Sequence, residues 1–198
     1  MVRMDSDSEL PVGVEAPAFE LPGTDGETYT LESFSDNEAL LLVVTCNHCP
    51  YAKAKEPELN RLADEYDDVA VVGVNPNDDE EYPDDSFEKM REYVESGRIG
   101  YDAYLRDESQ SVAAAYRAVC TPDPYLFAND DGTFRLAYHG RIDDALNPDD
   151  EPERFYMREA IEHVLNHETV PFADEELPSQ GCSIKWKPGN EPDYWDDL

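Results

Sequence analysis

The strongest structural signal in this chain is the stretch Leu40-Leu41-Leu42-Val43-Val44-Thr45-Cys46-Asn47-His48-Cys49-Pro50-Tyr51. An apolar run ends there in two cysteines with two residues between them, and a helical pattern follows directly. A near-continuous apolar run predicts a strand that is buried on both faces, as central strands of α/β sheets are. The sequence therefore predicts a central strand over 39–45 that delivers a Cys-x-x-Cys pair to the start of a helix.

A cysteine at the start of a helix is suited to redox chemistry. Its unpaired N–H groups and partial positive charge stabilise a thiolate. We expect Cys46 to be acidic and to act as the nucleophile, and Cys49 to resolve the mixed disulfide. His48 lies between them and is expected to stabilise the thiolate, which predicts an oxidising pair. The alternative for His48 is a solvated side chain with little effect on the thiols.

A metal site is the competing interpretation of the same residues. Cys46 and Cys49 have the spacing of half a zinc site, but the sequence contains no second Cys-x-x-Cys to complete it. The remaining histidines are scattered along the chain at His139, His163 and His167, and we interpret them as surface or packing residues. Redox chemistry is preferred, with no metal and no cofactor expected.

The net charge is the most extreme feature of the composition. Fifteen basic residues face forty-seven acidic ones, which gives a formal charge of -32. Such a charge destabilises a compact state at low salt, whereas molar salt shortens the Debye length to roughly 3 Å and screens the repulsion. Because the acidic residues are dispersed, we expect a halophilic protein; the alternative is an acidic face for a basic partner. No basic patch is present to meet phosphates, so a nucleic-acid partner is not expected.

The length of 198 residues predicts one domain with additions at its ends. We expect a flexible acidic tail over 1–11, a folded domain over 12–167, and an extension over 168–198 that is either packed on the domain or flexible. The first ten residues lack the apolar segment of a signal peptide, and no apolar run reaches membrane-spanning length. We therefore expect a cytoplasmic protein with reduced thiols and no membrane partner.

The predicted elements alternate along the chain. A β-hairpin turns at Asp25-Gly26, and a second hairpin turns at 129–132. Helices and strands alternate between them, and Pro57 is expected to kink or break the helix over 50–66. The second hairpin is too short for a parallel crossover, so the prediction is an α/β fold with a mixed central sheet flanked by helices and an N-terminal β-hairpin. The predicted segments are strands at 39–45, 69–75, 102–106, 120–127 and 133–139, and helices at 50–66, 86–96, 109–119 and 151–167.

Three landmarks now carry a family resemblance. They are Ala16-Pro17-Ala18-Phe19-Glu20-Leu21 with its Asp25-Gly26 turn, the strand into Cys46-Asn47-His48-Cys49-Pro50, and Thr121-Pro122 ahead of Leu126-Phe127 and Asp131-Gly132. Over roughly residues 12–166 the chain resembles the thioredoxin-fold redoxin superfamily, in its peroxiredoxin-like (AhpC/TSA-related) branch. Three of its segments also resemble an uncharacterised peroxiredoxin-like subgroup: Cys-Asn-His-Cys-Pro-Tyr, Cys-Thr-Pro-Asp and Gly-Cys-Ser-Ile-Lys-Trp-Lys.

The resemblance implies a thioredoxin-like fold with a cis-proline at Pro122, which opens a strand beside the cysteines. The backbone of Thr121 is then expected to pair with a substrate strand by β-augmentation. The alternative is an ordinary trans proline at the start of a strand.

The chain departs from both family patterns. A peroxiredoxin has Pro-x-x-x-Thr-x-x-Cys; with Cys49 in the place of its peroxidatic cysteine, Leu42 and Cys46 hold the Pro and Thr positions. The hydroxyl that orients a peroxide is thus missing from the strand. The buried acid that serves thioredoxins as a proton relay is also absent from 39–45, so a proton acceptor is expected from elsewhere in the chain.

Two further cysteines have open roles. Cys120 is expected to lie near the pair if Pro122 does, either as a third redox thiol or as a small buried hydrophobe. Cys182 is either a remote resolving cysteine or an inert thiol in a tail that Ile184 and Trp186 anchor.

These observations predict a thiol–disulfide oxidoreductase. Its expected partners are a disulfide-bearing protein or a small-molecule thiol or peroxide, together with a dithiol reductant. The alternatives are a peroxiredoxin-like thiol peroxidase and, in a different class, a metal-binding or chaperone-like module in which Cys46, His48 and Cys49 hold copper or zinc.

Overall fold

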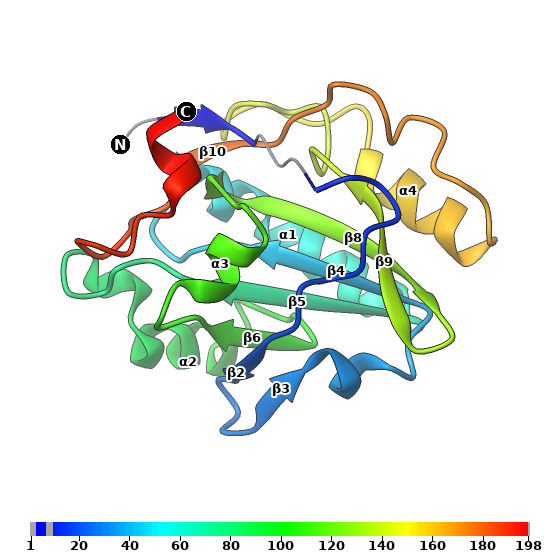
Figure 1. The fold of residues 1–198 in the computed structure, drawn as a ribbon. Coiled ribbons are helices and arrows are strands. Elements are labelled where there is room, and N and C mark those ends of the chain that lie inside the picture. Colours follow the sequence, from blue (N-terminus) through cyan, green and yellow to red (C-terminus); the bar gives the residue numbers. More distant parts are fainter. Residues whose placement is uncertain (1–2, 7–9, 198) are drawn as a thin grey trace.

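The computed structural model describes residues 3–6 and 10–197, and a five-stranded mixed sheet forms its centre (Figure 1). The strand order is β6-β5-β4-β8-β9. The first three run parallel, whereas β8 is antiparallel to β4 and β9 is antiparallel to β8. The mixed sheet predicted from the short second hairpin is confirmed. The strands are β4 (Ala39–Val44), β5 (Val69–Asn75), β6 (Ala103–Arg106), β8 (Asp123–Asp130) and β9 (Thr133–His139).

Strand β4 is central because it is apolar on both faces. All six of its residues are buried. Leu40, Leu42 and Val44 enter one hydrophobic core, and Leu41 and Val43 enter the other, as the period of two in a strand requires.

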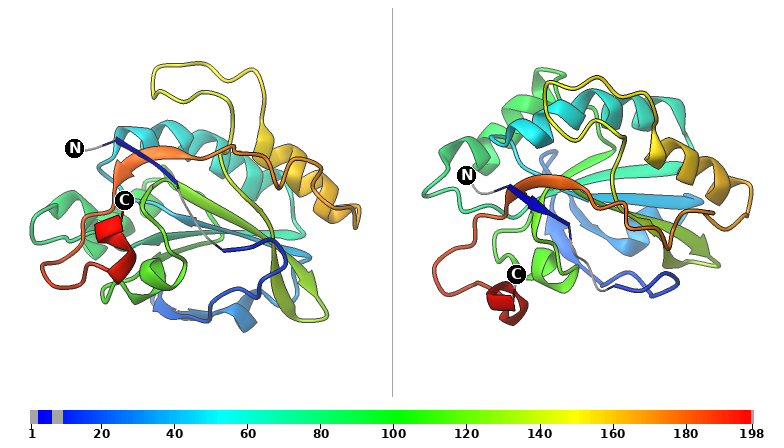
Figure 2. Two further views of the ribbon diagram at one scale, coloured as in Figure 1. Left: turned by 45° about the horizontal axis from the view of Figure 1, so that its top comes forward. Right: turned by 90° about the horizontal axis from the view of Figure 1, so that it is seen from above.

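Two layers cover the sheet, as Figure 2 shows from above. Helices α1 (Pro50–Glu65) and α4 (Tyr156–Leu165) pack on one face. The other face is covered by the N-terminal hairpin of β2 (Glu20–Pro22) and β3 (Thr28–Thr30) and by α3 (Ser111–Ala115). Helix α3 is shorter than the predicted 109–119. Of the two effects predicted for Pro57, a kink or a break, the break does not occur, because α1 continues through it.

The remaining helices are short. Helix α2 (Phe87–Glu95) begins at the predicted N-cap Ser86, whose side chain accepts a hydrogen bond from the Lys89 N–H. Three 3₁₀ turns complete the set: η1 (Leu31–Phe34), η2 (Pro83–Asp85) and η3 (Asp193–Asp197). Within the described ranges, no helix is long and apolar enough to cross a membrane.

The two ends of the chain meet in a second sheet. Its order is β1 (Arg3–Asp5), β10 (Gln180–Ser183) and β7 (Cys120–Thr121), and both pairings are antiparallel. The tail predicted to be flexible over 1–11 thus contains a paired strand, since β10 offers β1 an edge; residues 1–2 and 7–9 of that tail lie outside the described residues. The C-terminal extension packs on the domain through Ile184 and Trp186, which enter the core.

Candidate functional site

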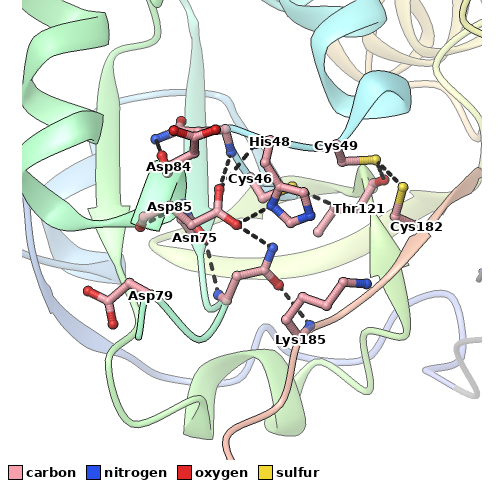
Figure 3. Close-up of polar contacts among 12 residues, drawn as sticks. Cys46, His48, Cys49, Asn75, Asp79, Asp84, Asp85, Thr121, Cys182 and Lys185 are labelled. Carbon is pink, nitrogen blue, oxygen red and sulfur yellow. Dashed lines mark hydrogen bonds and ion pairs between the residues drawn. The ribbon is translucent and has the colours of Figure 1, made fainter. Parts of the chain in front are cut away.

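The cysteine pair lies where β4 ends and α1 begins (Figure 3). Cys49 is the N-cap of α1, and Pro50 occupies its first turn, where a missing N–H costs nothing. Cys46, Cys49 and Cys182 are buried together against Ala52. A strand, a helix start and the C-terminal segment therefore bring three thiols into one cluster.

Cys49 is the sulfur at the centre of this cluster. Its Sγ lies 2.7 Å from Cys182 Sγ and 3.3 Å from the carbonyl oxygen of Thr121. Hydrogen bonds from the thiols of Cys182 and Cys46 lower the pKa of Cys49, and the backbone N–H of Ala52 in the first turn of α1 adds to them against the effect of burial. Cys49 is thus the thiol that ionises most readily.

Cys46 has the opposite character. Burial raises its pKa, and the hydrogen bond with Cys49 and the charge of Asp85 act in the same direction. Its Sγ lies 3.2 Å from Thr121 Oγ1. The sequence predicts an acidic Cys46, whereas the surroundings raise the pKa of Cys46 and lower that of Cys49. The physical reason is the helix boundary: α1 begins at Pro50, so its N-terminal N–H groups lie beside Cys49, while Cys46 is three residues upstream.

Asp85 is a buried carboxylate that the sequence did not single out. It lies at the end of η2, and its Oδ1 accepts hydrogen bonds from the backbone N–H groups of Asn47 (2.6 Å) and His48 (3.2 Å). Its Oδ2 lies 2.5 Å from His48 Nδ1 and accepts a 2.8 Å hydrogen bond from Asn77 Nδ2. Burial raises the pKa of Asp85, but the hydrogen bond and charge of His48, together with the hydrogen bonds from Asn77 and the Asn47 backbone, lower it by more.

His48 connects this carboxylate to the thiols. Its ring stacks on Tyr82 with centroids 4.8 Å apart, and Nδ1 faces Asp85. Nε2 is buried and makes no hydrogen bond among the described residues. The Cys46 sulfur, a His48 ring nitrogen and an Asp85 oxygen all lie within 4.8 Å of one another. The arrangement is thiol, imidazole and carboxylate in sequence, which suits proton transfer to and from Cys46.

The same three groups are the ones that a metal ion would meet. They replace the predicted trio of Cys46, His48 and Cys49 by one that contains Asp85. Both oxygens of Asp85 already accept two hydrogen bonds each, and one of these fixes Nδ1 of His48. A metal would have to displace these bonds, so the donor set fits proton transfer better than metal binding.

The Thr121-Pro122 peptide bond is cis, as the resemblance implied. It places the carbonyl of Thr121 against Cys49 and its hydroxyl against Cys46. The strand paired with Thr121 is the protein's own β10, which holds the position predicted for a substrate strand. Cys120, on the same short strand, is buried with its Sγ 3.7 Å from the carbonyl oxygen of Pro122. Burial, and after it the charge of Asp123, raise the pKa of Cys120.

Three comparisons place the chain among known proteins. Residues 12–139 match the family described as AhpC/TSA. An uncharacterized conserved protein from Geobacillus kaustophilus is 39% identical, with a TM-score of 0.86 over 96% of this chain and 98% of that one. The thiol:disulfide interchange protein DsbE of Haemophilus influenzae is 28% identical over 68% of this chain and 70% of its own length. Peroxidoxin BcpB from Mycobacterium tuberculosis shares the fold at 17% identity, with a TM-score of 0.56 over 82% of this chain and 97% of that one.

The sheet order, the cis-proline and these likenesses define a thioredoxin-fold redoxin. The family match and the likeness to DsbE support a thiol redox function. The chain belongs to the AhpC/TSA family.

Proposed function

We propose that the protein is a thiol–disulfide oxidoreductase in which Cys49 and Cys46 cycle between the dithiol and the disulfide. The observation that carries the proposal is the position of Cys49, an acidic thiol at a helix N-terminus with a second thiol of the same Cys-x-x-Cys motif hydrogen-bonded to it. The relative from Haemophilus influenzae, named for thiol:disulfide interchange, supports the same reaction class.

The geometry suggests the order of events. The Cys49 thiolate attacks a substrate disulfide, forms a mixed disulfide and releases one substrate thiolate. Cys46 then loses its proton to His48 Nε2 and attacks the Cys49 sulfur, which releases the second substrate thiolate. A dithiol reductant regenerates the pair by the reverse exchange. The two cysteines thus exchange the roles that the sequence assigned to them.

Asp85 orients His48 for the transfer of the proton from Cys46. A hydrogen bond from Nδ1–H to the carboxylate leaves Nε2 as the basic nitrogen and stabilises the imidazolium that forms. Asp85 therefore supplies the acid that β4 lacks. It acts through His48, which makes it a positioning residue.

The test is reduction of a protein disulfide such as that of insulin, with a dithiol donor and molar salt. Cys49→Ser is expected to abolish turnover, and Cys46→Ser is expected to stop it after the mixed disulfide forms. Cys120→Ser is the matched control and is expected to keep the wild-type rate. Turnover that survives Cys49→Ser would contradict the proposal.

One contact favours a second function, the reduction of hydroperoxides. The hydroxyl missing from β4 is replaced in space by that of Thr121, whose Oγ1 lies 3.2 Å from Cys46 Sγ. The carbonyl of the same residue lies 3.3 Å from Cys49 Sγ, so Thr121 contacts both thiols and its hydroxyl can orient a peroxide within the cysteine cluster. In that case Thr121→Val is expected to slow hydrogen peroxide consumption more than disulfide reduction. An equal effect on both rates would remove the argument for a peroxidase.

A further inference from the structure

Strand β10 lies where a thioredoxin-fold protein is expected to receive a substrate strand. It runs antiparallel to β7, with Cys182 opposite Thr121 and Ser183 opposite Cys120. The Ile184 N–H continues the pairing with a 3.1 Å hydrogen bond to the carbonyl oxygen of Val119. The C-terminal segment thus forms the backbone contacts of a bound peptide by β-augmentation.

The sequence of β10 allows an unusually close approach. A Cβ atom at Gly181 would lie 2.1 Å from the carbonyl oxygen of Thr121, so only glycine fits. The residue after this glycine is Cys182, and its sulfur meets Cys49 at 2.7 Å. The strand therefore presents a thiol to the most acidic cysteine of the site, as a substrate would.

The segment after Cys182 is tied to the proton-transfer residues. The Lys185 N–H donates a 2.9 Å hydrogen bond to Asn77 Oδ1, and the Asn77 side chain donates in turn to Asp85. Ile184 and Trp186 anchor the same segment in the core. Cys182 is thus held in place by contacts on its C-terminal side and by β1 and β7 on its two edges.

We propose that Cys182 is a third catalytic thiol and that β10 is a built-in substrate strand, so that the disulfide passes from Cys46–Cys49 to Cys49–Cys182. The proposal rests on the function proposed above and extends it. Cys49 is the sulfur shared by both disulfides, because it lies 2.7 Å from Cys182 Sγ and shares the Cys-x-x-Cys motif and the buried cluster with Cys46.

The exchange balances without a further oxidant. The Cys182 thiolate attacks the Cys49 sulfur of the Cys46–Cys49 disulfide, which the substrate disulfide has already formed. The Cys182–Cys49 bond forms, the Cys49–Cys46 bond breaks, and the electron pair leaves on Cys46. Cys46 takes up one proton, which balances the proton that Cys182 has lost. While β10 pairs with Thr121, that backbone is occupied, so a substrate disulfide has to reach Cys49 without β-augmentation at Thr121.

The experiment removes Cys46 and asks which partner Cys49 takes. The Cys46→Ala protein is treated with oxidised glutathione in molar salt, and its disulfides are mapped by mass spectrometry of unreduced peptides. A Cys49–Cys182 link is expected. Adding Cys120→Ala is expected to leave that link intact, whereas adding Cys182→Ala is expected to leave Cys49 as a mixed disulfide with glutathione. Cys49 held only as the glutathione adduct in the Cys46→Ala protein would overturn the proposal.

A second variant tests the strand rather than the thiol. Gly181→Ala is expected to push β10 away from Thr121 and to reduce the yield of the Cys49–Cys182 link severalfold. Gly100→Ala, where the new Cβ lies 3.7 Å from its nearest neighbour, is the control and is expected to leave the yield unchanged. An unchanged yield in Gly181→Ala would contradict the role of the strand.

The two proposals fail in different ways. Insulin turnover by the wild type, together with a Cys46–Cys49 link and no Cys49–Cys182 link in any variant, would overturn the relay and leave the oxidoreductase. A Cys49–Cys182 link in a wild type that turns over no disulfide would overturn the oxidoreductase.

Discussion

Residues 3–6 and 10–197 contain two largely buried histidine–aspartate pairs, and each lies near a cysteine. His48 pairs with Asp85 at 2.5 Å, and His139 pairs with Asp123 at 2.7 Å. Their burial is nearly identical, with histidine side chains 11% and 12% exposed and both aspartates fully buried. Neither burial nor pairing therefore separates a catalytic histidine from a structural one.

The two pairs differ in the histidine ring nitrogen that does not contact the aspartate and in the cysteine that lies nearby. His48 uses Nδ1 for its aspartate and keeps Nε2 without a hydrogen bond among the described residues, and one of its ring nitrogens lies within 4.8 Å of the Cys46 sulfur. His139 uses Nε2 for Asp123, and its ring stacks on Tyr125, whose hydroxyl donates to the same carboxylate. The second pair is a closed hydrogen-bonded network, while the first leaves one histidine nitrogen without a partner among the described residues and lies close to a thiol.

Replacing each histidine by alanine tests this distinction most directly. His48→Ala is expected to slow disulfide reduction by about 10² to 10⁴, the usual contribution of a general base. His139→Ala is expected to keep the rate within about twofold but to lower the free energy of unfolding by roughly 1–3 kcal/mol, because buried Asp123 loses a partner. Steady-state insulin reduction and denaturant unfolding in molar salt measure the two effects. A comparable loss of rate in both variants would remove the functional difference between the pairs.

The carboxylate of the active pair is expected to matter less than its histidine. Asp85→Asn keeps the shape but weakens the bond that orients His48, and a lost outer partner typically costs about ten- to a hundredfold. The loss is expected in kcat with KM unchanged, because Asp85 contacts no substrate. Asp85→Glu is expected to recover part of the rate. A change confined to KM, or a loss that no carboxylate recovers, would indicate a purely structural role.

The fold was readable from the sequence because its signals are local. The apolar run of β4 and the cysteines after it lie within a dozen residues, and their periodicity and spacing predict a buried strand and a helix start. The N-cap position of Cys49 was also within reach, since Pro50 favours the first turn of a helix. A helix that begins at Pro50 has its N-terminal N–H groups beside Cys49, which favours a low pKa for Cys49 rather than for Cys46.

The rest of the site depends on contacts that no local pattern carries. Asp85 is one of several acids in the loop after β5, and in a chain of charge -32 nothing distinguishes a buried carboxylate from a solvated one. Cys182 meets Cys49 across 133 residues, through a strand of four residues without a strong β-forming composition. Such a contact depends on how the extension folds back, which spacing does not encode.

The third test compares the cysteines near the two histidine–aspartate pairs. It is a pH titration of thiolate absorbance in the reduced protein. The lowered pKa of Cys49 means that its thiolate persists below the ordinary thiol value of 9.0 and is lost only as the pH falls through the lowered pKa. Cys182→Ala removes the largest cause of that shift. Since S–H is a weak donor and a hydrogen bond contributes about 1 kcal/mol net, the pKa of Cys49 is expected to rise by about one pH unit. Cys120→Ala, beside the closed pair, is expected to leave the low-pH transition unchanged. A transition that does not respond to Cys182→Ala but shifts in Cys120→Ala would contradict this assignment, because Cys120 would then be the thiol that lowers the pKa of Cys49.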